Sequence, residues 1–201
     1  MLQKVNESAM PGVAMKNNLN FHSLTPDRWS DLVRLFGERG ACGGCWCMSW
    51  RLKKAEFDAG KGDKNKRAFK RLVDRGAPTG IIAYMSDQPI GWCSVAPRED
   101  FVRLENARTL KRLDDKPVWS VVCLFVAKPY RNQGISVALL KAAAAWAKSQ
   151  GATLVEGYPT EPSAKLPDPF VWTGLASAFR KAGFKEVARP AKTRPIFRKH
   201  V

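Results

Sequence analysis

One segment constrains the fold of this chain more than any other, because an apolar run leads directly into a glycine-containing turn and then a helix. Residues 118–126, VWSVVCLFV, are β-branched and almost wholly apolar, which is typical of a strand covered on both faces. The turn AKPYRNQGIS follows. Residues 137–151, VALLKAAAAWAKSQG, then form an alanine-rich helical pattern that Gly151 ends. This order predicts an α/β domain.

The turn between this strand and this helix has the chemistry of an anion site. The first N–H groups of a helix have no internal partner and lie at the positive end of its dipole. Gly134 allows an anion to approach that backbone closely, and Arg131 and Lys128 add positive charge. The segment matches neither the P-loop nor the G-x-G-x-x-G pattern. It indicates a phosphate or pyrophosphate cradle, and the alternative is a plain strand-to-helix turn with a capping glycine.

The remaining sequence supplies further helices and strands. Thr25 is a predicted N-cap, Pro26 takes the first helical position, and Gly37 or Gly40 can end this helix. Residues 61–76 form a second, strongly basic helix. Other patterns predict strands at 20–24, 153–159, 185–189 and 194–200, a hairpin over 80–95 joined by Asp87-Gln88-Pro89, and a helix at 173–184 capped by Gly183. We expect a mixed, twisted central sheet flanked by helices.

Length and composition indicate one ordinary globular domain. The chain has 201 residues, 45% of them hydrophobic and 26% charged, and no apolar run reaches the length of a membrane span. Residues 1–19 lack the apolar core of a secretory signal and predict a flexible tail, which leaves residues 20–201 as the domain. We therefore expect a cytoplasmic protein without a membrane partner, either a monomer or a homodimer.

The charge balance is strongly basic. Lysine and arginine number 34 against 18 acidic residues, which gives a formal net charge of +16. Such an excess favours anionic partners, namely nucleic acid, a phosphorylated cofactor or an acidic substrate, and the alternative is a solubilising surface. The basic residues are spread along the chain without a recognised RNA-binding signature. Nucleic acid therefore stays an alternative partner that no motif supports.

Residues 40–50, GACGGCWCMSW, concentrate three of the five cysteines. A structural zinc site needs four ligands, yet no second C-x-x-C exists and His22 and His200 lie near opposite ends of the chain. A redox pair needs a helix N-terminus directly after it, and no clear cap follows. We expect no metal and reduced thiols. The loop is better interpreted as the wall of a pocket.

The segment VAKPYRNQGIS resembles the acetyl-CoA loop of the GNAT superfamily, the Gcn5-related N-acetyltransferases. Their loop reads [RQ]-x-x-G-x-[GA] after a strand, and here Arg131 is first and Gly134 fourth. Ser136 takes the last place, where glycine or alanine is usual. LLKAAAAWAKSQGATLVEGYP resembles the helix and strand that follow, and LASAFRKAGFKEV resembles a later helix of the family. The resemblance covers residues 20–199.

This resemblance implies two central parallel strands that splay apart to admit acetyl-CoA as co-substrate. An amine on a small-molecule or peptide acceptor would attack the thioester directly, so catalysis is mostly positioning with general acid and base help. The predicted cofactor-binding residues are Leu124, Phe125 and Val126 for the pantetheine arm, Arg131, Asn132, Gln133, Gly134, Ile135 and Ser136 for the pyrophosphate, and Phe179.

Two positions depart from the family pattern. Phe179 stands where the family usually has a tyrosine general acid, and Ser120 stands near the position of a glutamate base. We predict that Tyr158 and Glu156, at the end of the strand beside the cleft, take these catalytic roles. The alternatives are ordered water, a solvent-facing Glu156, and a turn at Tyr158.

The resemblance also assigns the cysteine loop, because the segment joining the first two helices lines the acceptor side in this family. CWCMSWR resembles a subgroup with a Cys-Trp-Cys run. We predict that Cys45, Trp46, Cys47 and Trp50 bind the acceptor in an apolar pocket, where an indole could stack on an aromatic or cationic group. The alternative is that these residues fill the core.

The leading interpretation is therefore an acetyl-CoA-dependent N-acetyltransferase. One alternative is a GNAT-like sensor that binds CoA without catalysis, which Phe179 makes reasonable. The other is a basic RNA-associated protein. The sequence does not name the acceptor.

Overall fold

A computed structural model describes residues 19–163 and 171–201 of the chain. The predicted tail, residues 1–19, lies outside the described residues except for Leu19, which already belongs to the first strand. The strands are β1 (Leu19–Ser23), β2 (Gly80–Met85), β3 (Gln88–Pro97), β4 (Trp119–Val126), β5 (Leu154–Gly157), β6 (Lys185–Ala191) and β7 (Arg194–His200). The helices are α1 (Trp29–Phe36), α2 (Lys54–Ala59), α3 (Asp63–Asp74), α4 (Val102–Glu105), α5 (Ile135–Ser149) and α6 (Ala176–Lys181).

Within the described residues the strands form one seven-stranded sheet in the order β1-β2-β3-β4-β5-β7-β6. All neighbouring strands are antiparallel except β4 and β5, which are parallel. The pairing of β4 with β5 stops at Val121 and Gly157, although β4 continues to Val126. The two strands therefore diverge, and the second half of β4 has an edge that β5 does not cover. The predicted mixed sheet is confirmed.

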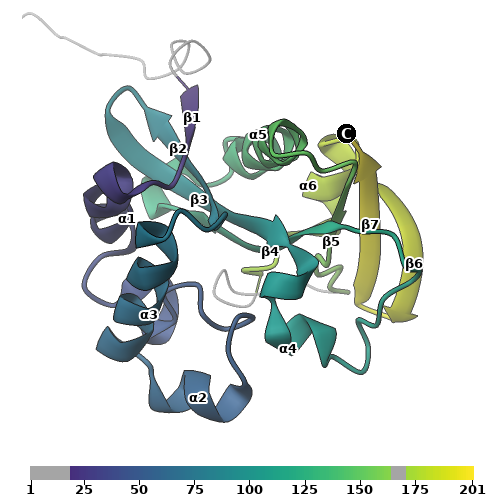
Figure 1. The fold of residues 1–201 in the computed structure, drawn as a ribbon. Coiled ribbons are helices and arrows are strands. Elements are labelled where there is room, and N and C mark those ends of the chain that lie inside the picture. Colours follow the sequence, from purple (N-terminus) through teal and green to yellow (C-terminus); the bar gives the residue numbers. More distant parts are fainter. Residues whose placement is uncertain (1–18, 164–170) are drawn as a thin grey trace, which may run out of the picture.

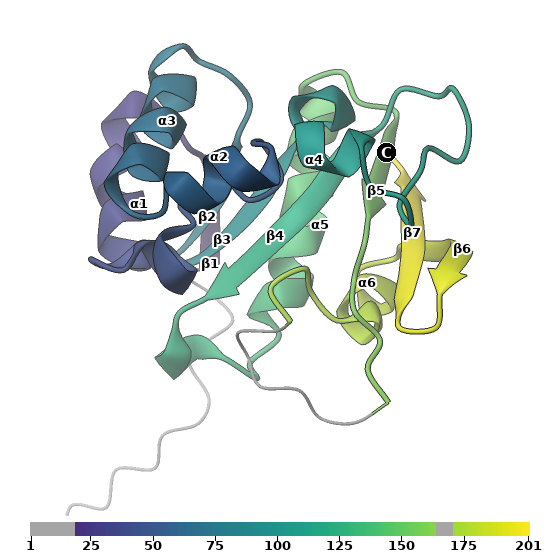
Figure 2. The same cartoon turned by 90° about the horizontal axis from the view of Figure 1, so that it is seen from below.

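Helices cover both faces of this sheet (Figures 1 and 2). Along β2, Ile81 and Ala83 pack into the core under α5, whereas Ile82 and Tyr84 pack into the core under α1 and α3. This alternation follows from the two-residue period of a strand and explains why β2 is apolar on both faces. Among the described residues, no helix combines the length and the apolarity needed to cross a membrane.

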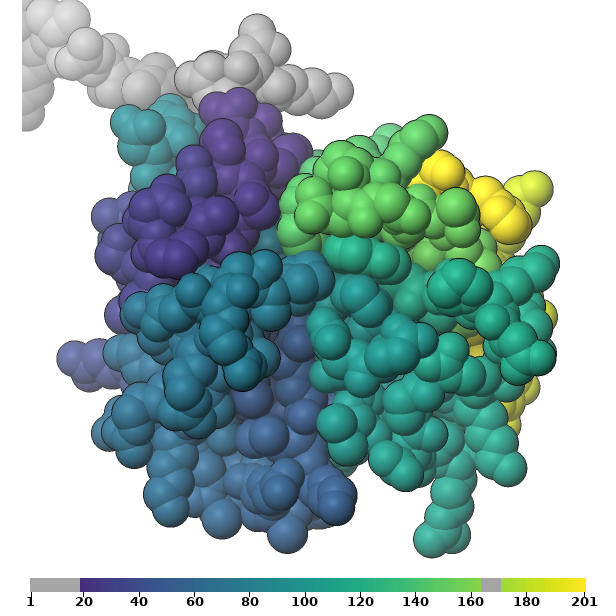
Figure 3. Space-filling model, viewed as in Figure 1, coloured from purple at the N-terminus to yellow at the C-terminus, as the bar shows by residue number. Residues whose placement is uncertain are grey.

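A third, smaller core lies under the segment around α4, and it includes Phe101, Leu104 and Tyr158. The backbone N–H of Arg103 donates to the carbonyl of Trp50, which joins this segment to the cysteine loop. In the space-filling view of Figure 3, the blue atoms of the α2–α3 region lie beside the teal atoms of the α4 region.

Two local predictions need correction. The hairpin turns at Ser86 and Asp87, and β3 already begins at Gln88, so Pro89 lies inside the strand. The pairing of β2 with β3 shifts register beside this proline, since Tyr84 pairs with Pro89 and Ala83 with Gly91. Such an irregularity accommodates a residue that has no N–H to donate. In addition, the short helix α2 precedes the predicted basic helix, which itself spans Asp63–Asp74.

Candidate functional site

The loop between β4 and α5 exposes backbone donors at the start of a long helix. Asn132 and Gly134 both have positive φ, +61° and +80°, and Gly134 is the N-cap of α5. Among the hydrogen bonds of the described residues, none is donated by the backbone N–H groups of residues 132–136. A Cβ built on Gly134 would meet no heavy atom within 4 Å. The loop is therefore an open cradle of N–H groups at the positive end of the α5 dipole.

A cavity of about 300 Å³ lies over this cradle and along the uncovered edge of β4. Its wall includes most of the residues predicted to hold the cofactor: Leu124, Phe125, Val126, Arg131, Asn132, Gly134, Ile135 and Ser136. The wall also includes residues that were not predicted to hold the cofactor, namely Ala41, Cys42, Tyr130, Val171, Trp172, Gly174, Leu175 and Ala178.

Gln133 and Phe179 are not among the wall residues of this cavity. The Gln133 side chain donates a hydrogen bond to the carbonyl of Pro129, so it braces the loop from outside. Phe179 is fully buried, and a Cβ on Gly157 would lie 2.2 Å from its ring. Phe179 therefore supports the end of β5 from within the core.

The free edge of β4 carries a partner from a distant segment. The backbone N–H of Leu124 donates a 2.7 Å hydrogen bond to the carbonyl of Trp172. The indole of Trp172 lies 5.9 Å from that of Trp50, measured between ring centroids. Trp172 thus connects the β4 edge to the cysteine loop. Its local sequence does not indicate this contact: it shows only an apolar pair, Val171 and Trp172, in an otherwise irregular segment.

A second cavity, also about 300 Å³, adjoins the first. The two share Ala41, Cys42, Leu124, Phe125 and Trp172, so they meet at β4. In the same stretch β4 carries an extra residue opposite β3, since Ser94 pairs with Cys123 and Val95 with Val121. Apart from this shared part, the wall of the second cavity consists of Phe36, Gly43, Cys45, Cys47, Ser49, Trp50, Phe57, Lys61, Val122 and Cys123.

Three of the four residues predicted to bind the acceptor line this second cavity, namely Cys45, Cys47 and Trp50. Trp46 does not line it. Its ring is 2% exposed and packs against Trp29 and Phe36 at 6.1 and 5.7 Å between centroids. A Cβ on Gly40 would lie 2.3 Å from the Trp46 indole nitrogen, which explains the glycine there. Trp46 therefore fills the core, which was the alternative interpretation of the loop residues.

Two thiols of this loop, those of Cys45 and Cys47, are held in their neutral form. Burial raises the pKa of Cys45 to about 12, and burial raises the pKa of Cys47 well above its usual range. The indole N–H of Trp92 donates to the Cys47 sulfur at 2.9 Å. All five cysteines are free, and the described residues include no group of three or more histidine, cysteine or acidic side chains that could hold a metal ion.

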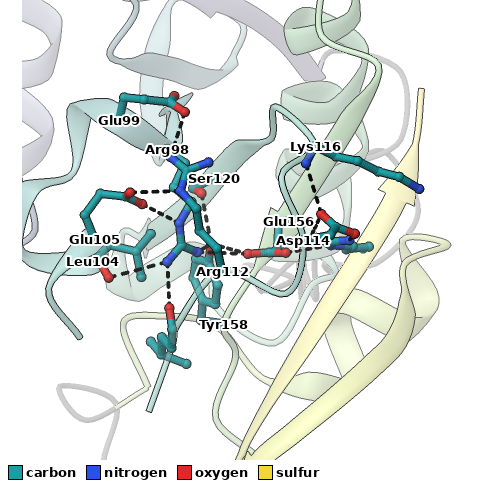
Figure 4. A network of polar contacts seen from close by, with 12 residues as sticks. Arg98, Glu99, Leu104, Glu105, Arg112, Asp114, Lys116, Ser120, Glu156 and Tyr158 are labelled. Atoms are coloured by element: carbon teal, nitrogen blue, oxygen red, sulfur yellow. Dashed lines mark hydrogen bonds and ion pairs between the residues drawn. The ribbon is translucent and has the colours of Figure 1, made fainter. Parts of the chain in front are cut away.

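Tyr158 and Glu156, the predicted catalytic pair, belong to a buried polar network (Figure 4). Each is 1% exposed, and neither lines the two cavities. The Tyr158 hydroxyl donates to Glu156 Oε1 at 2.5 Å, accepts from Arg98 Nη1 at 2.7 Å and lies 3.0 Å from Ser120 Oγ. Burial, and then the Glu156 charge, raise the pKa of Tyr158 well above its usual range. Its proton is therefore tightly held.

Arg98 is the centre of this network and was not anticipated from the sequence. Its guanidinium also contacts Glu156 Oε1 at 3.1 Å and Glu105 (Figure 4). It donates a further hydrogen bond to the carbonyl of Leu110 at 2.6 Å. Arg198 on β7 donates to the second oxygen of Glu156 at 2.6 Å. Glu156 thus has a cationic partner on each oxygen, as a buried carboxylate requires.

The site therefore combines two parallel strands, an open helix N-terminus beside them and two adjoining cavities in one α/β domain. The model of the acetyltransferase (GNAT) family matches residues 46–166. The chain belongs to this family. No curated protein sequence matches this chain.

Solved structures show the same fold at low sequence identity. A GNAT-family acetyltransferase of Streptococcus agalactiae aligns with a TM-score of 0.56 and 12% identity over 92% of this chain and 96% of the other. PaiA N-acetyltransferase of Thermoplasma acidophilum, in complex with coenzyme A, gives 0.52 and 14% over 91% and 99%. NAA60 of Arabidopsis thaliana, in complex with acetyl-CoA, gives 0.50 and 16% over 91% and 99%.

Proposed function

We propose that this protein transfers the acetyl group of acetyl-CoA to an amine, and that both substrates meet at β4. The observation that carries this proposal is the shared wall of the two cavities at Leu124 and Phe125, beside the open N-terminus of α5. The first cavity would hold acetyl-CoA and the second the acceptor. We also propose that residues 20–201 act as one domain.

The residues of the first cavity fit acetyl-CoA. Within the described part of the chain, the N–H groups of residues 132–136 donate no hydrogen bond and so suit a pyrophosphate, and the open space at Gly134 lets it approach the backbone. The β4 edge at Leu124 suits the amides of the pantetheine arm. Since the Leu124 N–H is bonded to Trp172, an arm lying along this edge would compete with that carbonyl. Gln133 and Phe179 would support the site without touching the cofactor.

Proton transfer would not need a side-chain base. Among the described residues that line the second cavity there is no carboxylate, histidine or tyrosine. Burial in an apolar cavity disfavours an ammonium ion, so it lowers the pKa of the bound amine and supplies the neutral nucleophile. The amine nitrogen then forms the new C–N bond while the C–S bond breaks. The amine proton passes to water, and the CoA thiolate is protonated from solvent.

The catalytic roles of Tyr158 and Glu156 stay a prediction. Their enclosure supports a different proposal, in which they are positioning residues. Ser120 on β4 pairs with Glu156 on β5, one step before the last registered pair of these strands. The network joins these two strands to Arg98, which follows β3 directly, and to Arg198 on β7. It would therefore fix the point at which the cofactor cleft opens.

Calorimetric titration of acetyl-CoA, followed by detection of free thiol with a panel of primary amines, tests this function. We expect one binding site and amine-dependent release of CoA. Failure to bind acetyl-CoA would contradict the proposal. Binding without release for any amine would favour the alternative of a CoA sensor.

A further inference from the structure

We propose that the second cavity selects acceptors that carry a single amino group on an apolar, ring-bearing body, and that it excludes polyamines and other polycationic amines. This inference names the acceptor class of the proposed function and rests on that function. It is carried by the chemistry of the cavity wall.

The wall offers rings and neutral thiols to a bound molecule. Phe36, Phe57, Trp50 and Trp172 contribute aromatic surface, and Cys45 is a neutral thiol at physiological pH. Such surfaces favour an aromatic body, which gains from burial and from ring-to-ring contacts. The wall reaches β4 at Val122–Leu124, so the amine end of the acceptor would lie beside the acetyl group. Its ring would lie toward Phe57 and Trp50, which the first cavity does not share.

The charge of the wall excludes a second cationic group. Lys61 is the one charged side chain among the described residues of this wall. The nearest carboxylate that contacts it, Asp58, is 3.1 Å from the Lys61 ammonium and also pairs with Lys54. Asp58 is therefore shared by two lysines, and the described wall offers no carboxylate to a second cation. A buried ammonium without a carboxylate partner is strongly disfavoured, as is any unpaired charge taken out of water.

Aromatic rings can also attract a cationic ligand, but here cationic side chains of the protein already lie over two rings of the wall. The Lys61 ammonium lies 5.5 Å from the centroid of the Phe57 ring, and the central carbon of the Arg103 guanidinium lies 5.7 Å from the centroid of the Trp50 ring. These two cations lie against rings of the wall that an aromatic cage would need for a cationic ligand. The rings that remain are suited to stacking with an uncharged body.

The test compares two amines on the full chain, with and without saturating CoA. Calorimetry should show that 2-phenylethylamine binds at least ~10-fold more tightly than spermidine, and thiol release with acetyl-CoA should follow the same order. Spermidine binding as tightly as 2-phenylethylamine, or no binding of 2-phenylethylamine, would overturn the inference. Acetyl-CoA titration on the same sample reports the proposed function separately, because the amine ranking without cofactor does not depend on it.

A matched pair of variants tests the physical reason. Cys45→Asp places a carboxylate in the wall, whereas Cys45→Asn adds the same volume without charge. We expect Cys45→Asp to bind spermidine at least ~5-fold more tightly than Cys45→Asn does, because the second ammonium gains a partner. Equal spermidine affinities in two folded variants would contradict this reason. Cys42, which is exposed and lies in the same wall, gives a second Asp and Asn pair that the fold tolerates more readily.

Discussion

The Tyr158 hydroxyl donates a 2.5 Å hydrogen bond to Glu156 Oε1, and both side chains are almost completely buried. Arg98 contacts both groups. This relationship lies where β4 and β5 are still paired, directly before the strands diverge. The sequence could not distinguish a proton-transferring role for Tyr158 from a positioning role. The burial of Tyr158 favours the positioning role, because a group that transfers protons must reach the substrates.

Tyr158→Phe should therefore cost stability more than turnover. The ring keeps its packing, but the variant loses the bond to Glu156 and leaves one Arg98 N–H short of an acceptor. We expect unfolding to become easier by about 1–3 kcal/mol. The rate per folded molecule and the acetyl-CoA affinity should stay within a few fold of the wild type. Denaturant unfolding and steady-state kinetics measure the two effects.

A matched control is Tyr84→Phe on β2, where the hydroxyl donates to the half-buried Asp31 at 2.8 Å. This change should cost less stability because water can replace the lost bond. A rate loss on the order of a hundredfold in Tyr158→Phe, with unchanged stability, would instead assign proton transfer to Tyr158.

The pH profile should follow the acceptor amine rather than a side chain of the protein. Only the neutral amine attacks, so kcat/KM rises with pH and levels off above the pKa of the free amine. Two acceptors whose amines differ in pKa should then give profiles displaced by that difference. An inflection that stays at one pH for both acceptors would reveal a base in the protein.

The cysteines should differ sharply in reactivity toward iodoacetamide, which reacts with thiolates. Cys42 is exposed and should be labelled at pH 8, whereas Cys45, with its pKa raised to about 12, should remain unlabelled. In the unfolded chain Cys45 loses its proton near pH ~8.5, so its contribution to stability is complete below that pH and falls as the pH rises toward 12. Peptide mass spectrometry after brief labelling at pH 8 checks the predicted difference between Cys42 and Cys45. Rapid labelling of Cys45 at pH 8 would contradict its neutral state.

The loop side of the first cavity was predictable because its residues are contiguous in the sequence. The apolar strand ending at Val126, the turn glycine at 134 and the helix beyond it each follow from local pattern, and the structure places all three around one cavity. Local pattern could not separate Gln133 from its neighbours. Its side chain turns back to Pro129, a choice that depends on the folded loop.

The contacts made by Trp172 and by Arg98 could not be predicted, because they join segments far apart in the sequence. Trp172 meets Leu124 through one backbone bond, and Arg98 reaches Glu156 across 58 positions. Neither contact leaves a periodic pattern. The helix α2 was missed for a related reason, since it buries only Phe57 and is too short for a helical period to stand out.

The most direct test of the central claim is the acetyl-CoA affinity of Gly134→Asp beside that of Gly134→Asn, each measured by calorimetric titration. Both side chains would enter open space, and both must adopt the same positive φ, so they should affect the fold alike. They differ in the negative charge placed in the cradle. We predict that Gly134→Asp binds acetyl-CoA at least ~10-fold more weakly than Gly134→Asn, a difference of about 1.4 kcal/mol. Equal affinities in two folded variants would show that the pyrophosphate does not lie over the start of α5 and would contradict the account.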